Sequence, residues 1–319
     1  MTEIHTDSNI VRKEMYLETD IRVHGTIWEP ADGDFKMVLQ IVHGMTEHMG
    51  RYERFAHELA AEGIVVAGLD LRGHGRNAGD YQIATWGIDG WKNSLNDIHA
   101  FYEKLQSQYH KPHVMLGFSL GSFLLRDYLS KFPEDVIDRA IIMGTGCQPG
   151  LILRAMKGII EKEIEKVGVD QTSELVKKLS FANYNKRFKP NRTNADWLCS
   201  DEKELDEYLN DPLCKEDISA GLFYDLLSAM LRTSSRYTYG NWRDISVLLL
   251  SGKMDPVGGM GKGVKKVYRQ MEREGIMVKM DLIDGARHDI LHEYESGAAH
   301  KVIQIILEYL ENTDNYLKI

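Results

Sequence analysis

A serine stands between two glycines at the end of an apolar run, in the stretch VMLGFSLGSF at residues 114–123. A hydroxyl becomes a nucleophile when a base takes its proton. Gly117 and Gly121 flank Ser119 although glycine inside a strand or helix costs about 1 kcal/mol relative to alanine. The order strand, Gly-x-Ser-x-Gly, helix is typical of a nucleophile elbow, a sharp turn that exposes the serine at the carboxyl end of a sheet. Small residues on either side would prevent clashes between the strand and the helix.

A serine nucleophile needs a histidine base, and that base needs a carboxylate to orient it. With a nucleophile elbow the order along the chain is serine, acid, histidine, each after a strand. Asp255 follows an apolar run in LLLSGKMDPVGG, and His288 follows the last predicted strand in MDLIDGARHD. Ligands bind at the carboxyl ends of strands in open α/β sheets. We therefore predict that Ser119, Asp255 and His288 form a catalytic triad.

The same chemistry requires hydrogen-bond donors for the oxyanion that develops on the substrate. One donor should be the backbone N–H of Leu120, the residue after the nucleophile, and the other should come from the loop after the third predicted strand. That loop reads HGMTEHMGRY at residues 43–52. Its His-Gly start suits a tight turn, so the N–H of Met45 is the predicted second donor.

The elements that must position these residues alternate between strand and helix. Apolar strands are predicted within residues 12–18, 21–30, 36–44, 64–70, 113–119, 138–146, 245–259 and 277–285. Helical spacing is found at residues 51–63, 90–109, 120–132, 262–275 and 298–312. Strands that are apolar throughout indicate a mostly parallel sheet with helices on both faces. The predicted fold class is α/β, a mostly parallel sheet interrupted by one helical insertion.

The alternation stops between residues 148 and 241, where the chain reads as mostly helical and irregular. Two apolar stripes at helical spacing occur here: Ile152, Met156, Ile160, Ile164 and Val167, then Leu222, Phe223, Leu226, Leu227, Met230 and Leu231. They can pack against the core, form the inner side of a lid over an apolar cavity, or do both. We predict a core of residues 1–147 and 242–319, with residues 148–241 inserted as a lid.

Composition narrows the function classes. The 319 residues include 39 basic and 48 acidic side chains, a net charge of −9, with no basic run and no zinc-knuckle spacing, so no nucleic acid partner is expected. Cys147, Cys199 and Cys214 form neither a disulfide framework nor a CxxC pair. Neither a signal peptide nor an apolar run of transmembrane length is recognised. We expect a cytoplasmic location, no metal and no organic cofactor.

Two alternatives to a catalytic triad are a zinc site and a binding protein without catalytic activity. The stretch HDILH places His288 and His292 four residues apart, like the zinc motif His-Glu-x-x-His. Aspartate is a methylene shorter than glutamate there, and no third ligand is evident. A non-catalytic binding protein on the same fold usually lacks a triad member, whereas all three are found here. Dehalogenases and epoxide hydrolases are disfavoured because they require aspartate at position 119.

The stretches HGMTEHMGRY, DLRGHGRN, GFSLGS, SGKMDPVGG and GARHDILHE together resemble the monoacylglycerol lipase and lysophospholipase group of α/β-hydrolases, which is filed with serine aminopeptidase-like (S33) hydrolases. The resemblance extends from about residue 20 to residue 310, and the segment NRTNADWLCSDEKELDEYLNDPLC is similar to bacterial members. It implies the same triad on Ser119, Asp255 and His288. It also implies oxyanion donors at Met45 and Leu120.

The resemblance further implies that Glu47 and Arg51 lie near the polar end of the substrate, although a structural ion pair is the plainer interpretation. Some lipases of the group carry a second histidine three residues after the catalytic one; here His292 is four residues on, and we retain it as a candidate substrate contact. The expected substrate is a monoacylglycerol or a lysophospholipid. The alternatives are small or feruloyl-type esters, or amides cleaved by a serine peptidase. Transient contact of the lid with a membrane surface is expected, and the oligomeric state is left open.

Overall fold

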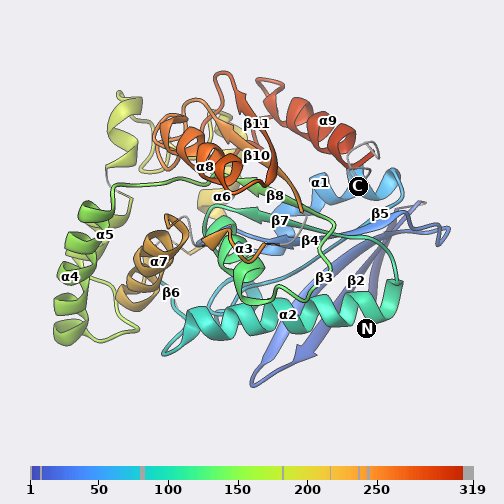
Figure 1. Cartoon of the computed structure of the whole chain (residues 1–319), viewed down its shortest axis with the longest axis horizontal. Helices are drawn as coiled ribbons and strands as arrows, with labels where there is room; N and C mark the ends of the chain where they lie inside the picture. The colour runs from blue at the N-terminus through green and yellow to red at the C-terminus, as the bar shows by residue number, and fades with distance from the viewer. Residues whose placement is uncertain are drawn as a thin grey trace.

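A nine-stranded sheet forms the centre of the molecule, with strand order β1-β2-β3-β5-β4-β7-β8-β10-β11 (Figure 1). The computed structural model describes residues 2–7, 9–79, 83–181, 183–215, 217–235, 238–242 and 245–311, the side chains of residues 2–7 and 83 excepted. Its strands are β1 (Thr2–Asp7), β2 (Ile10–Glu18), β3 (Arg22–Pro30), β4 (Met37–Val42), β5 (Ile64–Leu69), β7 (His113–Phe118), β8 (Arg139–Met143), β10 (Ser246–Gly252) and β11 (Met277–Ile283).

The sheet is parallel from β5 through β11, and only β1, β2 and β3 run antiparallel to their neighbours. All residues of β5, β7, β8 and β10 are buried. A strand can be apolar along its whole length only where both faces of the sheet are covered. The predicted mostly parallel α/β sheet is therefore confirmed.

Helices cover both faces of this sheet. The helices of the core are α1 (Glu53–Ala61), α2 (Gly90–Tyr109), α3 (Leu120–Lys131), α8 (Lys262–Arg273) and α9 (Ala298–Glu311), with the short 3₁₀ turns η1 (Met49–Tyr52) and η2 (Gly75–Asn77). Apolar side chains of α1 and α9 pack together on one face, and those of α2, α3 and α8 pack on the other. This arrangement fixes the carboxyl ends of the parallel strands along one edge, where loops can carry functional side chains.

The segment between β8 and β10 forms further helices, as the loss of alternation predicts. They are α4 (Gly150–Val167), α5 (Glu174–Ser180), η3 (Tyr184–Phe188), α6 (Glu202–Asn210) and α7 (Ala220–Thr233). Leu153 and Ile160 of α4 and Phe223 and Leu227 of α7 are buried in the same cluster as residues of α3. The inserted helices thus share part of the main core, while Ile152 of the predicted stripe stays exposed. The division into core and lid remains a prediction.

Two features of the fold were not predicted. Strand β1 pairs with β2 although its sequence is polar and acidic, because backbone pairing with a neighbour needs no apolar pattern. The two-residue strands β6 (Ile83–Ala84) and β9 (Asp217–Ile218) pair in parallel and connect the inserted segment to the loop before α2. No helix in the described part of the chain is both long and apolar enough to cross a membrane.

Candidate active site

Ser119 occupies a strained turn between β7 and α3. Its backbone has φ 51° and ψ −113°, a conformation that a residue with a side chain rarely adopts. The Ser119 N–H donates to the Met143 carbonyl at 3.0 Å, which ties the turn to β8. The strain is thus held by the packed strands, and it presents the hydroxyl at the sheet edge as a nucleophile elbow does.

The two glycines around Ser119 are explained by close backbone packing. A Cβ atom on Gly121 would lie 1.9 Å from the Val42 carbonyl oxygen, and one on Gly117 would lie 2.4 Å from the Gly121 carbonyl oxygen. Both distances are far below van der Waals contact. Glycine is therefore required here because β7, α3 and β4 meet at the turn, as the spacing of the motif indicates.

The structure brings Ser119, His288 and Asp255 together from three separate loops. His288 Nε2 lies 2.9 Å from Ser119 Oγ, and His288 Nδ1 lies 3.0 Å from Asp255 Oδ1. The N–H at Nδ1 is not well aligned with that carboxylate oxygen. The contact between His288 and Asp255 is therefore close enough for an ion pair but lacks the geometry of a hydrogen bond. Asp255 is fully buried and accepts hydrogen bonds from the Val257 N–H at 2.8 Å and from Ser251 Oγ at 3.2 Å. These bonds fix the carboxylate beside the imidazole.

Aromatic rings enclose the imidazole of His288. The rings of Phe118 and Trp197 have centroids 5.0 Å and 5.2 Å from it. Burial by itself lowers the pKa of His288, but the neighbouring Asp255 carboxylate raises it, and the net shift is upward from the ordinary value of 6.5. The imidazole is therefore a stronger base than a free histidine.

The backbone N–H groups predicted to bind an oxyanion lie beside Ser119. Met45 lines both cavities that reach Ser119, and Leu120 lines the apolar one. Leu120 is the first residue of α3, where backbone N–H groups lack a partner within the helix. The turn that carries Met45 is held by Glu47, whose Oε1 accepts a hydrogen bond from the Gly44 N–H at 2.5 Å. An oxyanion role for both residues fits this geometry and stays a prediction.

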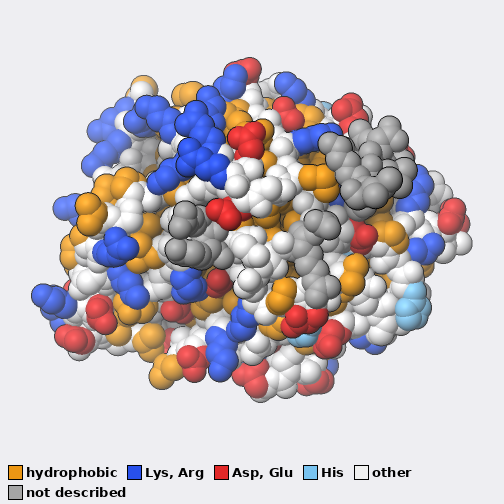
Figure 2. Space-filling view, in the orientation of Figure 1, with side chains coloured by type: hydrophobic (Ala, Val, Ile, Leu, Met, Phe, Trp, Pro, Cys, Tyr) orange, Lys and Arg blue, Asp and Glu red, His pale blue; other side chains and the backbone are white. Residues whose placement is uncertain are grey.

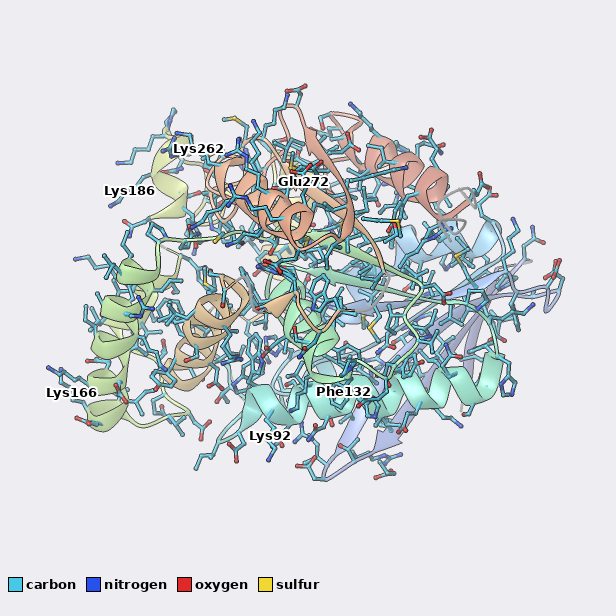
Figure 3. The ribbon with its side chains drawn as sticks, in the orientation of Figure 1. Lys92, Phe132, Lys166, Lys186, Lys262 and Glu272 are labelled. Carbon is cyan, nitrogen blue, oxygen red and sulfur yellow. The ribbon has the colours of Figure 1, made fainter. Side chains whose placement is uncertain are left out.

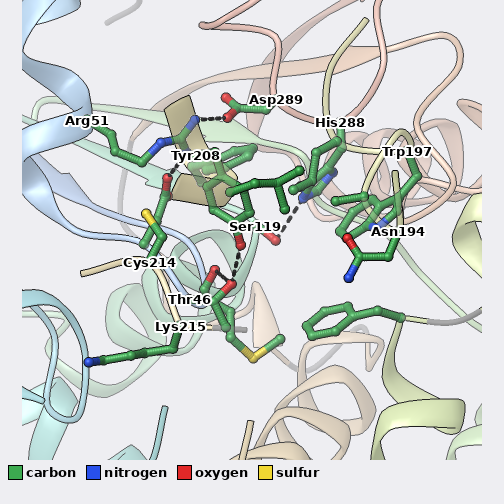
Figure 4. A pocket seen from close by; sticks show the side chains of 17 residues that line it. Thr46, Arg51, Ser119, Asn194, Trp197, Tyr208, Cys214, Lys215, His288 and Asp289 are labelled. Carbon is green, nitrogen blue, oxygen red and sulfur yellow. Dashed lines mark hydrogen bonds and ion pairs between the residues drawn. The ribbon is translucent and has the colours of Figure 1, made fainter. Parts of the chain in front are cut away.

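Glu47 and Arg51 belong to a buried network of charges. Arg51 pairs with Glu47 at 2.6 Å and with Asp289 at 2.8 Å (Figure 4), and Tyr52 donates to Glu47 at 2.9 Å. Burial alone would raise the pKa of Asp289, but the charges of His292 and Arg51 lower it well below its ordinary range. The network anchors the Met45 turn to the loop that carries His288. Glu47 and Arg51 also line a cavity at Ser119, so they remain candidate substrate contacts.

The structure does not bring His292 to Ser119. Its Nδ1 lies 2.8 Å from Asp289 and its Nε2 lies 3.0 Å from the Arg51 carbonyl oxygen. It lines a separate polar groove with His48 and Glu204. Both of its ring nitrogens have protein partners, one of them in η1. A substrate contact at His292 stays a prediction that this position does not favour.

Two cavities meet at Ser119, one mainly apolar and the other of mixed polarity. A cavity of about 260 Å³ is lined mainly by apolar side chains of α3, α4 and α7, namely Phe123, Leu153, Met156, Phe223, Leu226, Leu227 and Met230. A cavity of about 140 Å³ carries polar groups, namely Thr46, Glu47, Arg51, Asn194, Tyr208, Lys215 and Asp289 (Figure 4). A bound molecule with one apolar arm and one polar arm would present its middle to the Ser119 hydroxyl.

The stretch HDILH, considered above as a zinc motif, offers no free histidine nitrogen to a metal ion. Both ring nitrogens of His288 and of His292 contact protein groups. One other group of potential metal ligands occurs among the described residues: His48, Asp211 and Cys214 lie with ligand atoms within 4.8 Å of one another. His48 Nε2 already lies 2.8 Å from Asp211, and its Nδ1 accepts the Gly50 N–H at 3.1 Å. His48 and Asp211 thus already form a hydrogen-bonded link between the inserted segment and η1.

Several residues near Ser119 carried no usable signal in the sequence. Trp197 comes from an irregular part of the insertion and Tyr184 is the first residue of η3. Tyr184 lies close enough to Asp255 that burial and this charge raise its pKa to about 12. Tyr208 of α6 forms a 2.7 Å hydroxyl–hydroxyl hydrogen bond with Thr46. Periodicity cannot reveal such contacts, because they join residues that are far apart in the sequence. They depend on how the insertion folds over the sheet edge.

Comparison with known proteins agrees with this geometry. Residues 33–295 match the family model described as serine aminopeptidase, S33. Monoglyceride lipase from Mus musculus is 23% identical over 291 residues, covering 86% of each chain. Monoacylglycerol lipase from Mycolicibacterium smegmatis is 31% identical over 123 residues, which is 36% of this chain and 40% of that protein. The stronger local match thus spans less than half of the mycobacterial relative.

Solved structures show the same fold. A thermostable carboxyl esterase from Bacillus coagulans aligns with a TM-score of 0.84 at 24% identity, over 93% of this chain and 98% of the esterase. A soluble variant of monoglyceride lipase from Saccharomyces cerevisiae aligns with a TM-score of 0.73 at 16% identity, over 98% of both chains. The predicted α/β-hydrolase fold is confirmed by these matches.

Proposed function

Since the chain belongs to the serine aminopeptidase S33 family of α/β-hydrolases and is a serine hydrolase, we propose that it hydrolyses carboxylic esters of monoacyl lipids. The observation that carries this proposal is the 2.9 Å contact between Ser119 Oγ and His288 Nε2, at the junction of an apolar cavity and a cavity of mixed polarity that carries several polar groups. A monoacylglycerol or a lysophospholipid has this division into an acyl chain and a polar alcohol. The ester bond between them is what the serine would attack.

In the proposed mechanism His288 Nε2 takes the proton of Ser119 as Oγ attacks the ester carbonyl carbon. The N–H groups of Met45 and Leu120 donate to the resulting oxyanion. The tetrahedral intermediate expels the alcohol, which takes the proton from His288, and an acyl-enzyme remains on Ser119. Water then attacks the acyl carbon while His288 removes its proton. The acid leaves and Ser119 regains its hydrogen.

Asp255 supports this cycle by holding His288 in one tautomer. Its carboxylate beside Nδ1 keeps the proton on that nitrogen, so that Nε2 faces Ser119 as the acceptor. It also stabilises the imidazolium that forms in each half of the reaction. Because Asp255 receives two hydrogen bonds of its own, its carboxylate is held in place beside the ring.

The pH dependence of activity should report the environment of His288. The base must be neutral, and its pKa is raised above 6.5, so kcat/KM for a soluble ester is expected to fall toward acid with a midpoint above pH 6.5. Measuring kcat/KM between about pH 5 and 9 with an uncharged ester isolates this group, because histidine is the side chain that ordinarily titrates there. A midpoint below 6.5, or a flat profile, contradicts the role assigned to His288.

A panel of esters tests the substrate class. We expect p-nitrophenyl esters of medium and long acyl chains, a monoacylglycerol and a lysophosphatidylcholine to be hydrolysed faster than acetate, because the apolar cavity gains contacts with each methylene. The variant Met156→Trp, which narrows that cavity, should lower kcat/KM for long chains and leave acetate nearly unchanged. A preference for acetate or for feruloyl esters would replace the lipid assignment with a small or aromatic ester. Cleavage of amides alone would favour a peptidase.

A further inference from the structure

One face of this acidic chain is basic. We define the basic face as seven exposed residues of the segment containing η3 and of α8: Lys186, Arg187, Lys189, Lys262, Lys265, Lys266 and Arg269. Figure 2 shows Lys and Arg side chains gathering in the upper left of the view, where Figure 1 places α8 and where Figure 3 labels Lys186 and Lys262. The chain as a whole carries a net charge of −9, so this concentration of positive charge is local.

The basic face lacks neutralising partners among the described residues. None of its seven side chains forms an ion pair there, and residues 175–195 contain no Asp or Glu. On α8 the acidic side chain is Glu272, in the last turn. Unpaired lysines held near one another repel, so the face gains from binding an anionic surface.

Exposed apolar side chains belong to the wall of the apolar cavity that η3 also borders. Leu151 and Ile152 in the first turn of α4 are 80% and 54% exposed, and Ile152 also lines the cavity. Asn183 and Tyr184, which come just before Lys186 in the chain, line the same cavity. The cavity wall therefore includes exposed apolar residues of α4 and the start of the basic segment at η3.

We propose that the basic face and the apolar edge at Leu151 and Ile152 dock together on an anionic phospholipid surface. The positive side chains would lie among the lipid headgroups, while Leu151 and Ile152 would enter the boundary with the acyl chains. The cavity entrance would then open toward the membrane, from which a monoacyl lipid could pass to Ser119 without crossing water. The consequence for catalysis rests on the proposed function; the binding itself does not.

An anionic membrane fits this surface better than the other polyanions. Single-stranded nucleic acids stack their bases on aromatic side chains, and the basic face contributes lysines and arginines only. An acidic protein would pair with the charges but would leave no role for large apolar side chains next to a lipid-sized cavity. The combination of Lys and Arg with exposed aliphatic residues is typical of helices that lie in a membrane interface.

Vesicle sedimentation tests the docking with the full-length protein. We expect the wild type to bind vesicles of phosphatidylcholine with about a third phosphatidylglycerol at least about 100-fold more tightly than pure phosphatidylcholine, with the difference falling as salt increases. The triple variant Lys262→Gln/Lys265→Gln/Lys266→Gln should lose about 100-fold, since each basic residue near the surface contributes about fivefold. Equal binding to both vesicles, or no binding to either, overturns the proposal.

Matched variants separate a docking surface from a general charge effect. Lys92, Lys104 and Lys131 are exposed on α2 and α3, and Lys92 lies at the opposite end of the view from Lys262 (Figure 3). The triple variant Lys92→Gln/Lys104→Gln/Lys131→Gln removes the same charge and should bind anionic vesicles like the wild type. Leu151→Ser should weaken binding, whereas Val136→Ser, at another exposed aliphatic residue, should not. Equal losses in the two triple variants contradict a localised docking face.

Activity measurements distinguish failure of the docking from failure of the proposed function. The α8 triple variant should keep the wild-type kcat/KM for a soluble p-nitrophenyl ester and lose rate on monoacylglycerol in anionic vesicles by about tenfold or more. Hydrolysis of both substrates at wild-type rates would contradict the docking and leave the esterase intact. A wild type that binds anionic vesicles yet cleaves no ester would contradict the proposed function and leave the docking intact.

Discussion

Replacing Ser119 with alanine is expected to lower kcat for ester hydrolysis by about 10⁵-fold or more, because no other group near His288 can form the acyl-enzyme. The fold should survive the change. The Ser119 hydroxyl contacts His288 and not the β7 or β8 backbone, and the strained turn is set by the chain around it. Steady-state kinetics with a soluble p-nitrophenyl ester, alongside a thermal melt, measure both effects.

Ser122 provides the matched control. It lies three residues on in the same motif, and its hydroxyl donates to the Ser119 carbonyl at 2.6 Å instead of facing the cavities. Ser122→Ala should cost about 1 kcal/mol of stability from the lost hydrogen bond, with kcat close to the wild type. An enzyme that keeps its rate without Ser119, or loses it without Ser122, would contradict the assignment of the nucleophile.

Replacing Asp255 with asparagine is expected to lower kcat by about 10⁴-fold, because the amide can hold the imidazole in the wrong tautomer and cannot stabilise the imidazolium. The acid limb of kcat/KM should also move to lower pH, since the Asp255 charge is what raises the pKa of His288 against burial. A merely structural carboxylate would not move that limb. A pH profile of the variant therefore separates the two roles.

Asp289 is the matched control for Asp255, because it is the chain neighbour of His288. Its carboxylate contacts Arg51 and His292 and neither ring nitrogen of His288. Asp289→Asn should cost far less activity than Asp255→Asn, with a loss that follows loosening of the Met45 turn. If Asp289→Asn proved the more damaging change, the orienting acid would have been assigned to the wrong residue.

Much of the fold could be predicted from the sequence because its signals are local. The apolar strands β5, β7, β8 and β10 are buried on both faces, so each stands out as a continuous apolar run. The amphipathic spacing of α2 and α9 is equally plain. The antiparallel strand β1 is the counter-example, because its polar residues are held in the sheet by pairing with β2.

Asp255 and His288 could be predicted as partners of Ser119 because a nucleophile elbow is followed along the chain by an acid and then a histidine. Ser119, Asp255 and His288 each follow a strand, and parallel strands bring such loops to one edge. The packing of Trp197 against His288 could not be foreseen, because it depends on how an irregular segment folds back over the sheet. His292 shows the same limit in reverse: its spacing allowed a substrate role, whereas its ring lines another groove and both of its nitrogens contact protein groups.

The basic face was invisible in the sequence for a related reason. Lys186 and Lys262 belong to segments separated by the whole of α6, α7 and β10, and neither segment alone forms a run of basic residues. The net charge of −9 and the absence of a basic run led us to expect no nucleic acid partner. Only the fold places the two segments on one side of the molecule (Figure 3).

Covalent labelling decides whether Ser119 is a nucleophile activated by His288. An alkyl fluorophosphonate transfers its phosphorus to an activated serine oxygen with loss of fluoride. We expect one adduct by intact mass, located by peptide mapping on Ser119, absent from Ser119→Ala and strongly slowed in His288→Ala. An adduct on another residue, or an esterase that takes no label and loses its activity with EDTA, would contradict that role of Ser119.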